Sequence, residues 1–237
     1  MAHAAVMLCA GRATRMQGAV ADKVLAPLAG RPALAYSIQA FLAAGIVDQF
    51  VFVVRDTEQQ RAIAKLFAQV ARGKNAKALY VRGGAERQDS VYNGVRKLST
   101  KVDCVFIHDC ARPLITPAVL QTLLAAVQKD QAAVLAHRVT DTIKQVRAEK
   151  KLERQKLRDL RRETLWAMET PQAFARELIL RAYEKVRAKK LRVTDDVAAV
   201  TALGHPVTIV ENPSPNPKLT HPEDFAWVEL LLGRTKG

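Results

Sequence analysis

Long apolar runs are missing from this chain of 237 residues. No stretch approaches the roughly 20 apolar residues that a helix needs to cross a bilayer. The first residues, MAHAAVMLCAG, also lack the basic segment and the longer apolar run of a secretory signal. We therefore expect neither a membrane partner nor export. Apolar residues still make up 49% of the chain, which is enough for a full core and argues against wholesale disorder.

Cysteine is scarce, with Cys9, Cys104 and Cys110 alone. The number is odd, and each residue lies in or beside an expected strand. No CxxC or Cys/His spacing typical of a zinc site occurs. We therefore expect reduced thiols in a cytoplasmic protein rather than a disulfide framework.

Aromatic residues are few, at 5%, and acidic residues are outnumbered: 37 Lys and Arg against 23 Asp and Glu give a net charge of +14. Such a charge favours anionic partners, which include nucleotides, phosphorylated metabolites, nucleic acids and acidic membranes. No RRM, KH or zinc-finger signature accompanies the charge, so a nucleic-acid partner is not expected. Much of the excess lies between Lys144 and Arg162, which also fits a solvated surface arm.

Apolar, β-branched runs alternate with helical patterns in the first half of the chain. Strands are expected at 4–8, 50–55, 78–81, 104–108 and 132–136, and helices between them near 32–44, 58–71, 89–98 and 117–129. This rhythm predicts an α/β fold with a mostly parallel sheet that is covered on both faces. Such sheets bind ligands at the carboxyl ends of their strands.

The rhythm changes after residue 139, where a strand, a charged turn and a returning segment predict a β-hairpin arm over about 139–165. Helices near 174–189 and 195–203, a strand at 206–210 and a last helix near 222–232 complete the expected elements. No repeat or long linker divides the sequence. A single domain over 1–237 with a projecting arm is therefore the simplest organisation.

The first expected strand runs into a small-residue turn, Cys9-Ala10-Gly11, which lets the backbone approach a ligand closely. Its N–H groups could cradle phosphate oxygens, while Arg15 and Lys23 could neutralise a polyphosphate. The loop contains neither GxxxxGK[ST] nor GxGxxG. Taken alone, it is weak evidence for nucleotide binding.

Two further loops follow expected strands. In VRGGAERQDSV the glycines allow close contact with a base or ribose, while Asp89 or Ser90 fits a helix N-cap. In IHDCARP, Asp109 is the candidate ligand for Mg²⁺, which prefers few carboxylates plus substrate oxygens. An aspartate that caps the turn and pairs with Arg112 is the alternative. Further along, VTDD is typical of a helix start with Thr194 as the cap.

The order of these motifs is more specific than any one of them. RxxRM, GGxxRxDSV, HDxARP, DTIK, RxxLW, TPQxF, TDD and NxKxTxPED follow one another over about residues 4–232. In this respect the chain resembles the 2-C-methyl-D-erythritol 4-phosphate cytidylyltransferases. The resemblance implies a Rossmann-like nucleotidyltransferase fold, which is a three-layer α/β/α sandwich, and a homodimer joined through the arm. It also implies transfer of CMP from CTP to 2-C-methyl-D-erythritol 4-phosphate, with Mg²⁺ and release of pyrophosphate, in non-mevalonate isoprenoid biosynthesis.

The resemblance also implies residue roles. Arg15 and Lys23 match the pair that stabilises the transition state, and Arg162 and Lys218 match the pair that positions the substrate phosphate. The residues that match the CTP-binding positions are Cys9, Ala10, Gly11, Gly83, Ser90, Asp109 and Cys110. Asp109 also matches the position near the metal. Thr142 and Thr194 match positions near the polyol.

The chemistry of this transfer agrees with the residue types. A phosphate monoester is already an anionic nucleophile, so no Ser-His-Asp arrangement is needed. Positive charge and Mg²⁺ have to offset the repulsion between two anions and the charge on leaving pyrophosphate. The cations of the opening loop are therefore expected to meet the triphosphate of CTP.

Some positions depart from the family pattern. Cys9 stands where alanine is usual, and Ala13 where a second glycine is usual, which narrows the backbone freedom of the loop. Asp22 replaces a common proline, and the spacing to Lys23 is longer by about one residue. Arg162, rather than its neighbour Arg161, is assigned to the substrate phosphate because its spacing to Leu165-Trp166 fits the RxxLW motif.

Three alternatives stay open at this point. Ribitol 5-phosphate cytidylyltransferase has a similar frame, although LWAMETPQ and TDD favour the erythritol enzyme. Other sugar or molybdopterin nucleotidyltransferases share the first loop but fit the later motifs poorly. A basic nucleic-acid-binding module is the remaining candidate, suggested only by the net charge.

Overall fold

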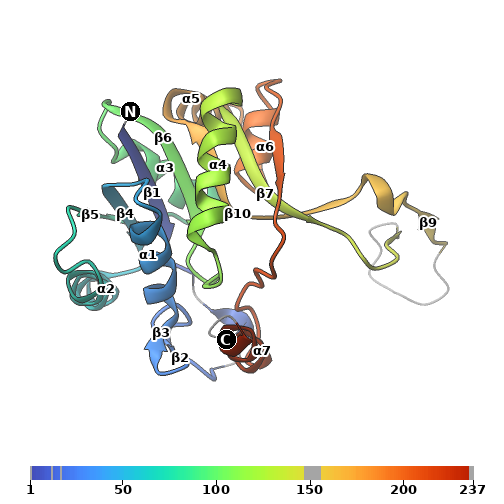
Figure 1. Ribbon diagram of the computed structural model, residues 1–237. Helices are drawn as coiled ribbons and strands as arrows, with labels where there is room; N and C mark the ends of the chain where they lie inside the picture. Colours follow the sequence, from blue (N-terminus) through green and yellow to red (C-terminus); the bar gives the residue numbers. More distant parts are fainter. Residues whose placement is uncertain (1, 12, 17, 147–155, 235–237) are drawn as a thin grey trace.

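A seven-stranded sheet forms the centre of the computed structural model, which describes residues 2–11, 13–16, 18–146 and 156–234 (Figure 1). The strand order is β11-β7-β10-β6-β1-β4-β5. β10 runs antiparallel to β6 and β7, and the other neighbouring strands are parallel. The strands are β1 (Ala2–Leu8), β4 (Gln49–Val54), β5 (Lys77–Arg82), β6 (Val102–Asp109), β7 (Ala132–Arg138), β10 (Trp166–Ala175) and β11 (Thr208–Glu211). The expected α/β fold with a mostly parallel sheet is confirmed.

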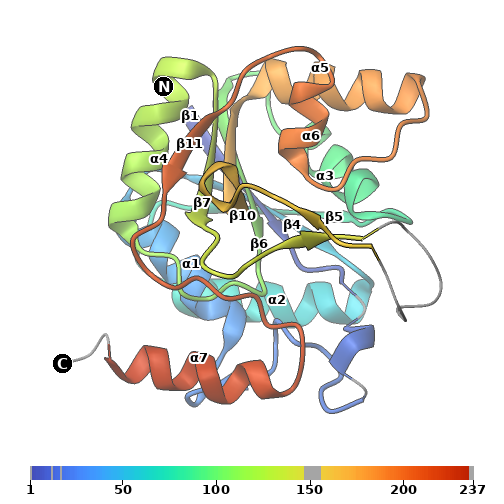
Figure 2. The same cartoon turned by 90° about the vertical axis from the view of Figure 1, so that its right-hand side faces the viewer.

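Helices cover both faces of the sheet (Figure 2). On one face lie α1 (Ala33–Ala44), α2 (Thr57–Val70) and α4 (Pro117–Asp130), and on the other lie α3 (Arg87–Arg96), α5 (Arg176–Ala188) and α6 (Asp196–Thr201). Because strand side chains alternate between faces, Met7 joins the α1 side while Val6 joins the α3 side. The result is a three-layer α/β/α sandwich with two apolar layers.

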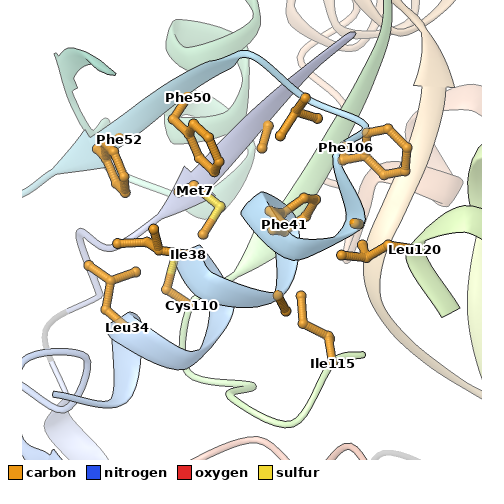
Figure 3. Packing of buried hydrophobic residues seen from close by; sticks show 14 of the residues in the cluster. Met7, Leu34, Ile38, Phe41, Phe50, Phe52, Phe106, Cys110, Ile115 and Leu120 are labelled. Carbon is orange, nitrogen blue, oxygen red and sulfur yellow. The ribbon is translucent and has the colours of Figure 1, made fainter. Parts of the chain in front are cut away.

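The α1 side is built around aromatic rings (Figure 3). Phe41 of α1 meets Phe50 and Phe106 of the sheet edge-on, at ring-centroid distances of 6.2 and 6.0 Å. All three are fully buried. Edge-to-face pairs of this kind add to the stabilisation from burial alone, so this layer fixes α1 firmly on the central strands.

Two helix caps differ from the sequence prediction. α3 begins at Arg87 with Glu86 as its N-cap, and Asp89 closes the capping box from inside the first turn. α6 is capped by Asp195, whose carboxylate accepts from Ala198 N, so the cap expected at Thr194 is wrong. In both cases a carboxylate closer to the helix start satisfies the free N–H groups.

The sequence did not reveal β10. Its last part was expected to be the start of a helix at 174, which instead begins at Arg176. Glu169, Thr170 and Gln172 are all buried in this strand. Polar residues at buried positions hide the strand from a hydrophobic-pattern analysis.

The expected arm extends away from the sheet (Figure 1). Its strands are short: β8 (Lys144–Gln145) pairs antiparallel with β9 (Arg158–Asp159), and a 3₁₀ turn, η2 (Arg162–Thr164), leads back to β10. The strand expected over 139–146 is thus limited to two residues, and the tip at 147–155 lies outside the described residues. In the described part of the arm, three apolar side chains are exposed: Ile143, Val146 and Leu157.

A smaller apolar cluster holds the remaining elements, which are η1 (Thr14–Met16), the ribbon of β2 (Pro27–Leu28) and β3 (Arg31–Pro32), and α7 (Glu223–Arg234). Met16 and Leu28 pack there with Leu219 and Val228. The cluster therefore ties the segment before α7 to the first loop. In the described ranges, no helix combines the length and apolar character that a bilayer crossing requires.

We expect Gly94→Ala to destabilise the protein. In an exposed helix this change gains about 1 kcal/mol. At Gly94 of α3, however, the added Cβ would lie 2.6 Å from Val6 Cγ1 and 3.1 Å from Val53 Cγ2, and overpacking of this kind costs about 1–3 kcal/mol. Urea unfolding of both forms measures the difference. Gly233→Ala in α7 is the control, because its Cβ meets nothing within 4 Å; equal changes at both positions would contradict the steric explanation.

Candidate functional site

A cavity of about 360 Å³ opens at the carboxyl ends of the central strands. Its wall combines the loop after β1, the loop between β5 and α3, the end of β6 and the segment before α7. Several residues singled out from the sequence line it: Cys9, Ala10, Gly11, Arg15, Lys23, Ser90, Asp109 and Lys218. The strand ends and the segment before α7 thus bring together residues that are more than two hundred positions apart.

Two predicted CTP-binding residues lie behind the wall rather than in it. A Cβ at Gly83 would come within 2.8 Å of Ala10 Cβ and 3.0 Å of Ser90 Oγ, so this glycine lets the two loops pack closely. Cys110 is fully buried, with its Sγ 3.5 Å from Cys9 Sγ. Both positions shape the cavity from beneath.

The structure does not bring three further predicted residues to this cavity. Thr142 and Arg162 lie exposed on the arm, where Arg162 Nη1 donates to Thr140 O at 2.8 Å. Thr194 is exposed just before α6. Within one copy of the chain, the cavity is therefore lined without them.

Three cations meet on one side of the cavity. Lys23 Nζ donates to Leu219 O at 3.0 Å, which places it beside Lys218. Burial, followed by the charges of Lys218 and Arg15, lowers the pKa of Lys23 below its ordinary value. Positive charges that repel one another in a half-buried site create a strong potential for an anion.

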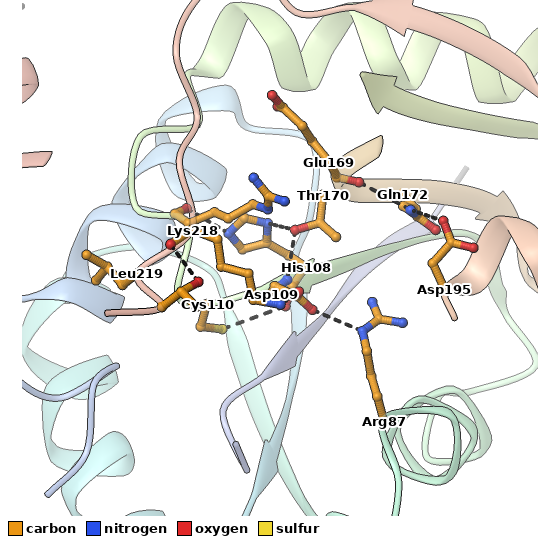
Figure 4. A network of polar contacts seen from close by, with 12 residues as sticks. Arg87, His108, Asp109, Cys110, Glu169, Thr170, Gln172, Asp195, Lys218 and Leu219 are labelled. Atoms are coloured by element: carbon orange, nitrogen blue, oxygen red, sulfur yellow. Dashed lines mark hydrogen bonds and ion pairs between the residues drawn. The ribbon is translucent and has the colours of Figure 1, made fainter. Parts of the chain in front are cut away.

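Asp109 is the acidic centre of the cavity (Figure 4). Its Oδ1 accepts from Arg87 Nε at 3.2 Å, its Oδ2 accepts from Lys218 Nζ at 2.5 Å, and its N–H donates to Thr170 Oγ1 at 3.0 Å. Burial alone would raise the pKa of this carboxyl, but the Arg87 and Lys218 charges outweigh it and hold the pKa well below its usual range. Asp109 is therefore ionised at any physiological pH.

The alternative in which Asp109 pairs with Arg112 is wrong. The Arg112 side chain donates instead to Asn216 O at 2.6 Å, and only its backbone N–H bonds to Asp109 O, at 2.9 Å. The partner found in the structure, Arg87, is the arginine of the GGxxRxDSV motif. The GGxxRxDSV motif includes Arg87, but nothing in the sequence indicated that this arginine binds the Asp109 carboxylate.

His108 supports the Asp109 turn from inside the core. Its ring contacts Thr170 Oγ1 at 3.3 Å and Ser37 Oγ at 3.2 Å, and the residue is fully buried. Burial lowers the pKa of His108 to about 3, so the ring is neutral near pH 7. It acts as a packed, hydrogen-bonded residue.

The donor set fits a metal that arrives with a phosphate ligand. Among the residues that the structure describes, no group of three or more His, Cys, Asp or Glu side chains is arranged to hold a metal. Asp109 offers one ionised carboxylate in the cavity wall. Mg²⁺ commonly binds through one or two carboxylates while substrate phosphates and waters complete its shell, so this site fits Mg²⁺ with a polyphosphate.

Comparison with known proteins gives one consistent result. The model of the family "IspD: 2-C-methyl-D-erythritol 4-phosphate cytidylyltransferase" matches residues 3–234. The curated enzyme of that name from Pelotomaculum thermopropionicum is 38% identical over 99% of this chain and 95% of its own length. The enzyme from Shouchella clausii is 39% identical over 98% and 97%.

Solved structures agree with the sequence matches. The crystal structure of 2-C-methyl-D-erythritol 4-phosphate cytidylyltransferase from Thermus thermophilus superposes with a TM-score of 0.77, at 27% identity over 98% of both chains. The 4-diphosphocytidyl-2C-methyl-D-erythritol synthase of Anaerococcus prevotii has the same fold, with a TM-score of 0.82 over 98% of both chains at 22% identity.

These matches extend from end to end and confirm the resemblance seen in the ordered motifs. The chain therefore belongs to the IspD family, the cytidylyltransferases that act on 2-C-methyl-D-erythritol 4-phosphate in non-mevalonate isoprenoid biosynthesis.

Proposed function

We propose that the cavity binds CTP with its triphosphate against Cys9-Ala10-Gly11 and the cations behind that turn. The single observation that carries this assignment is the meeting of Arg15, Lys23 and Lys218 in one cavity that also contains an ionised carboxylate. In the reaction, a phosphate oxygen of the acceptor forms a bond to the α-phosphorus. The bond from that phosphorus to the bridging oxygen breaks, and pyrophosphate leaves with the bonding electron pair.

Arg15 and Lys23 stabilise the charge that grows on the α-phosphoryl oxygens and on the leaving pyrophosphate. Both line the cavity next to the small-residue turn. Lys23 is held in place by its bond to Leu219 O. Fixed donors in a water-poor site stabilise developing charge better than mobile water does.

Asp109 holds Mg²⁺ in this proposal. The ion, when bound, offsets negative charge on the phosphates. The chain's own contribution is an ionised, oriented carboxylate at the end of β6: Arg87 binds the carboxylate itself, and Thr170 accepts from the backbone N–H of the same residue. No proton transfer is assigned to Asp109, because its low pKa makes it a poor acid or base at pH 7.

The loop between β5 and α3 binds the base. Ser90 Oγ accepts from Gly84 N at 3.0 Å and donates to Glu86 O at 3.2 Å, so the hydroxyl fixes the loop from inside. Gly83 allows this loop to lie directly on Ala10. The cytidine would therefore meet a stiff backbone surface beside the phosphate turn.

The acceptor phosphate binds Lys218 from one side and Arg162 from the other, with Thr142 and Thr194 near the polyol. Because Arg162 and Thr142 lie on the arm outside the cavity of their own chain, a second copy must supply them. An isolated two-stranded ribbon is marginally stable in water, and exposed Ile143, Val146 and Leu157 give the arm an apolar surface to cover. We therefore propose a homodimer in which each arm serves the partner's cavity.

A cytoplasmic location agrees with the state of the thiols. Cys9, Cys104 and Cys110 are free and buried. The Cys9 and Cys110 sulfurs lie 3.5 Å apart and form no disulfide. Reduced thiols at this separation suit a reducing compartment.

Arg15→Ala should reduce kcat/KM for CTP by at least ~10²-fold, about the loss seen when one transition-state donor is removed. Steady-state pyrophosphate release with 2-C-methyl-D-erythritol 4-phosphate measures the change. Arg61→Ala, at an exposed position of α2, is the control for loss of a positive charge. If Arg15→Ala keeps more than half of the wild-type turnover, the residue has no part in the reaction.

Arg162→Ala should raise KM for the acceptor by about 10-fold or more and leave KM for CTP nearly unchanged, because a charge-assisted hydrogen bond contributes about 1.5–3 kcal/mol. Lys218→Ala should also raise KM for the acceptor more than KM for CTP. The neighbouring Arg161→Ala is the matched control for Arg162. A larger effect at Arg161 would move the assignment in the arm by one residue, and equal effects on both substrates would indicate structural damage instead.

At acceptor concentrations well below the wild-type KM, a mixture of Arg15→Ala and Arg162→Ala proteins should be more active than either alone. In a mixed dimer, one cavity keeps its own Arg15 and receives an intact arm from its partner. Random assortment then restores about a quarter of the wild-type activity at equal amounts. Sedimentation should show a species near twice 26.1 kDa. A monomer with normal turnover, or a dimer whose impaired variants do not complement under these conditions, would contradict the shared site.

A further inference from the structure

Arg87 lines the cavity but binds two carboxylates at once, of which Figure 4 shows the contact to Asp109. Its Nε donates to Asp109 Oδ1 at 3.2 Å, while its two terminal nitrogens donate to Asp196 Oδ1 and Oδ2 at 3.1 and 2.8 Å. Every nitrogen of the guanidinium is therefore used. The planar group has a fixed orientation between the end of β6 and the start of α6.

Asp196 is an immobile anchor for this arginine. It is fully buried, accepts the Tyr183 hydroxyl at Oδ1, and donates its backbone N–H to Gln172 Oε1 at 3.1 Å. α5, α6 and β10 thus all hold the carboxylate in place. A bidentate arginine–carboxylate pair of this kind is strong and directional.

The second partner of Asp109 is held much less firmly. Lys218, on the segment before α7, reaches Oδ2 through one hydrogen bond from a flexible side chain, whereas three hydrogen bonds to two carboxylates hold the guanidinium of Arg87. If Lys218 turns to an acceptor phosphate, Oδ2 loses its partner while Oδ1 stays bound to Arg87. The carboxylate then keeps its direction and offers a free oxygen to the cavity.

We propose that Arg87 and Asp196 form a fixed clamp that aims the Asp109 carboxylate, and that Lys218 is the partner that leaves it when substrate binds. This inference rests on the proposed function, in which Asp109 faces the metal and the triphosphate. Arg87 and Asp196 are positioning residues, because they act through Asp109. Asp196, the last residue of the TDD motif, thereby has a role in the site as the anchor of Arg87.

Three variants test the clamp: Arg87→Gln, Asp196→Asn and the double variant. Each single change should lower kcat about 10- to 100-fold, as the loss of groups that orient a metal ligand does. The double variant should lose no more than the worse single variant, since both residues act through one contact. Arg187→Gln is the matched control, because Arg187 makes a half-exposed ion pair between α5 and Asp89 of α3, outside the cavity.

Thermal unfolding separates positioning from structural support. Arg87→Gln leaves the fully buried Asp196 without its cation, and Asp196→Asn leaves Arg87 with Asp109 as its one carboxylate partner. Each single variant should therefore melt at a lower temperature, whereas the double variant removes both charges and should regain part of that loss. The clamp predicts that kcat does not recover with the melting temperature. If kcat follows the melting temperature across the set, the pair is only structural and the inference is wrong.

Titration calorimetry with CTP gives a readout that is independent of turnover. Arg87→Gln should bind CTP like the wild type without metal but lose most of the gain in affinity that Mg²⁺ provides. Asp109→Asn distinguishes the two proposals. An inactive Asp109→Asn beside an almost fully active Arg87→Gln would overturn the clamp and leave the proposed function standing. An Asp109→Asn protein with normal kcat would remove Asp109 from the proposed reaction, and the clamp with it.

Discussion

The site depends on a row of alternating charges at the carboxyl end of β6: Lys218, Asp109, Arg87 and Asp196. Asp109 and Asp196 are largely or wholly buried, and an unpaired charge at such depth would be strongly destabilising. Each carboxylate is therefore matched by a cation that spans from another part of the chain. The two positive and two negative charges of the row balance, and Arg15 and Lys23 add positive charge to the cavity wall.

Parallel strands explain why the row can form. β1 and β6 are neighbours in register, with Leu8 opposite Asp109, so the small-residue turn and the carboxylate leave the sheet side by side. The next position along each strand is a cysteine, and the two sulfurs lie 3.5 Å apart. A larger side chain at Cys9 or Cys110 would push the turn away from Asp109. Cysteine at both positions meets this requirement for a small side chain.

The sequence predicted the parallel part of the sheet and most of the cavity wall, because those depend on local patterns. The apolar runs that became β1, β4 and β6 alternate with amphipathic helices, and a turn after such a strand lies at the ligand edge by geometry. Pairings over long separations were not predictable. Arg87 and Asp196 are hydrogen-bonded across 109 positions. A single sequence contains no signal that the arginine of the GGxxRxDSV motif will bind Asp196 as well as Asp109. Thr142 and Arg162 lie outside the cavity of their own chain, and their predicted roles depend on a second copy of the chain.

β10 is the element that the sequence concealed and that organises the site. Its buried polar residues each hold a different part of the wall. Glu169 Oε2 accepts from Asn212 and Asn216 at 2.8 and 2.9 Å and fixes the segment that leads to Lys218. Thr170 accepts from the Asp109 N–H, and Gln172 accepts from the first N–H groups of α6, where Asp196 lies. A purely apolar strand would be easier to recognise and would bury its side chains at lower cost. The antiparallel strand instead uses its polar groups to hold the lysine segment, the carboxylate turn and the anchor of Arg87 in one rigid frame.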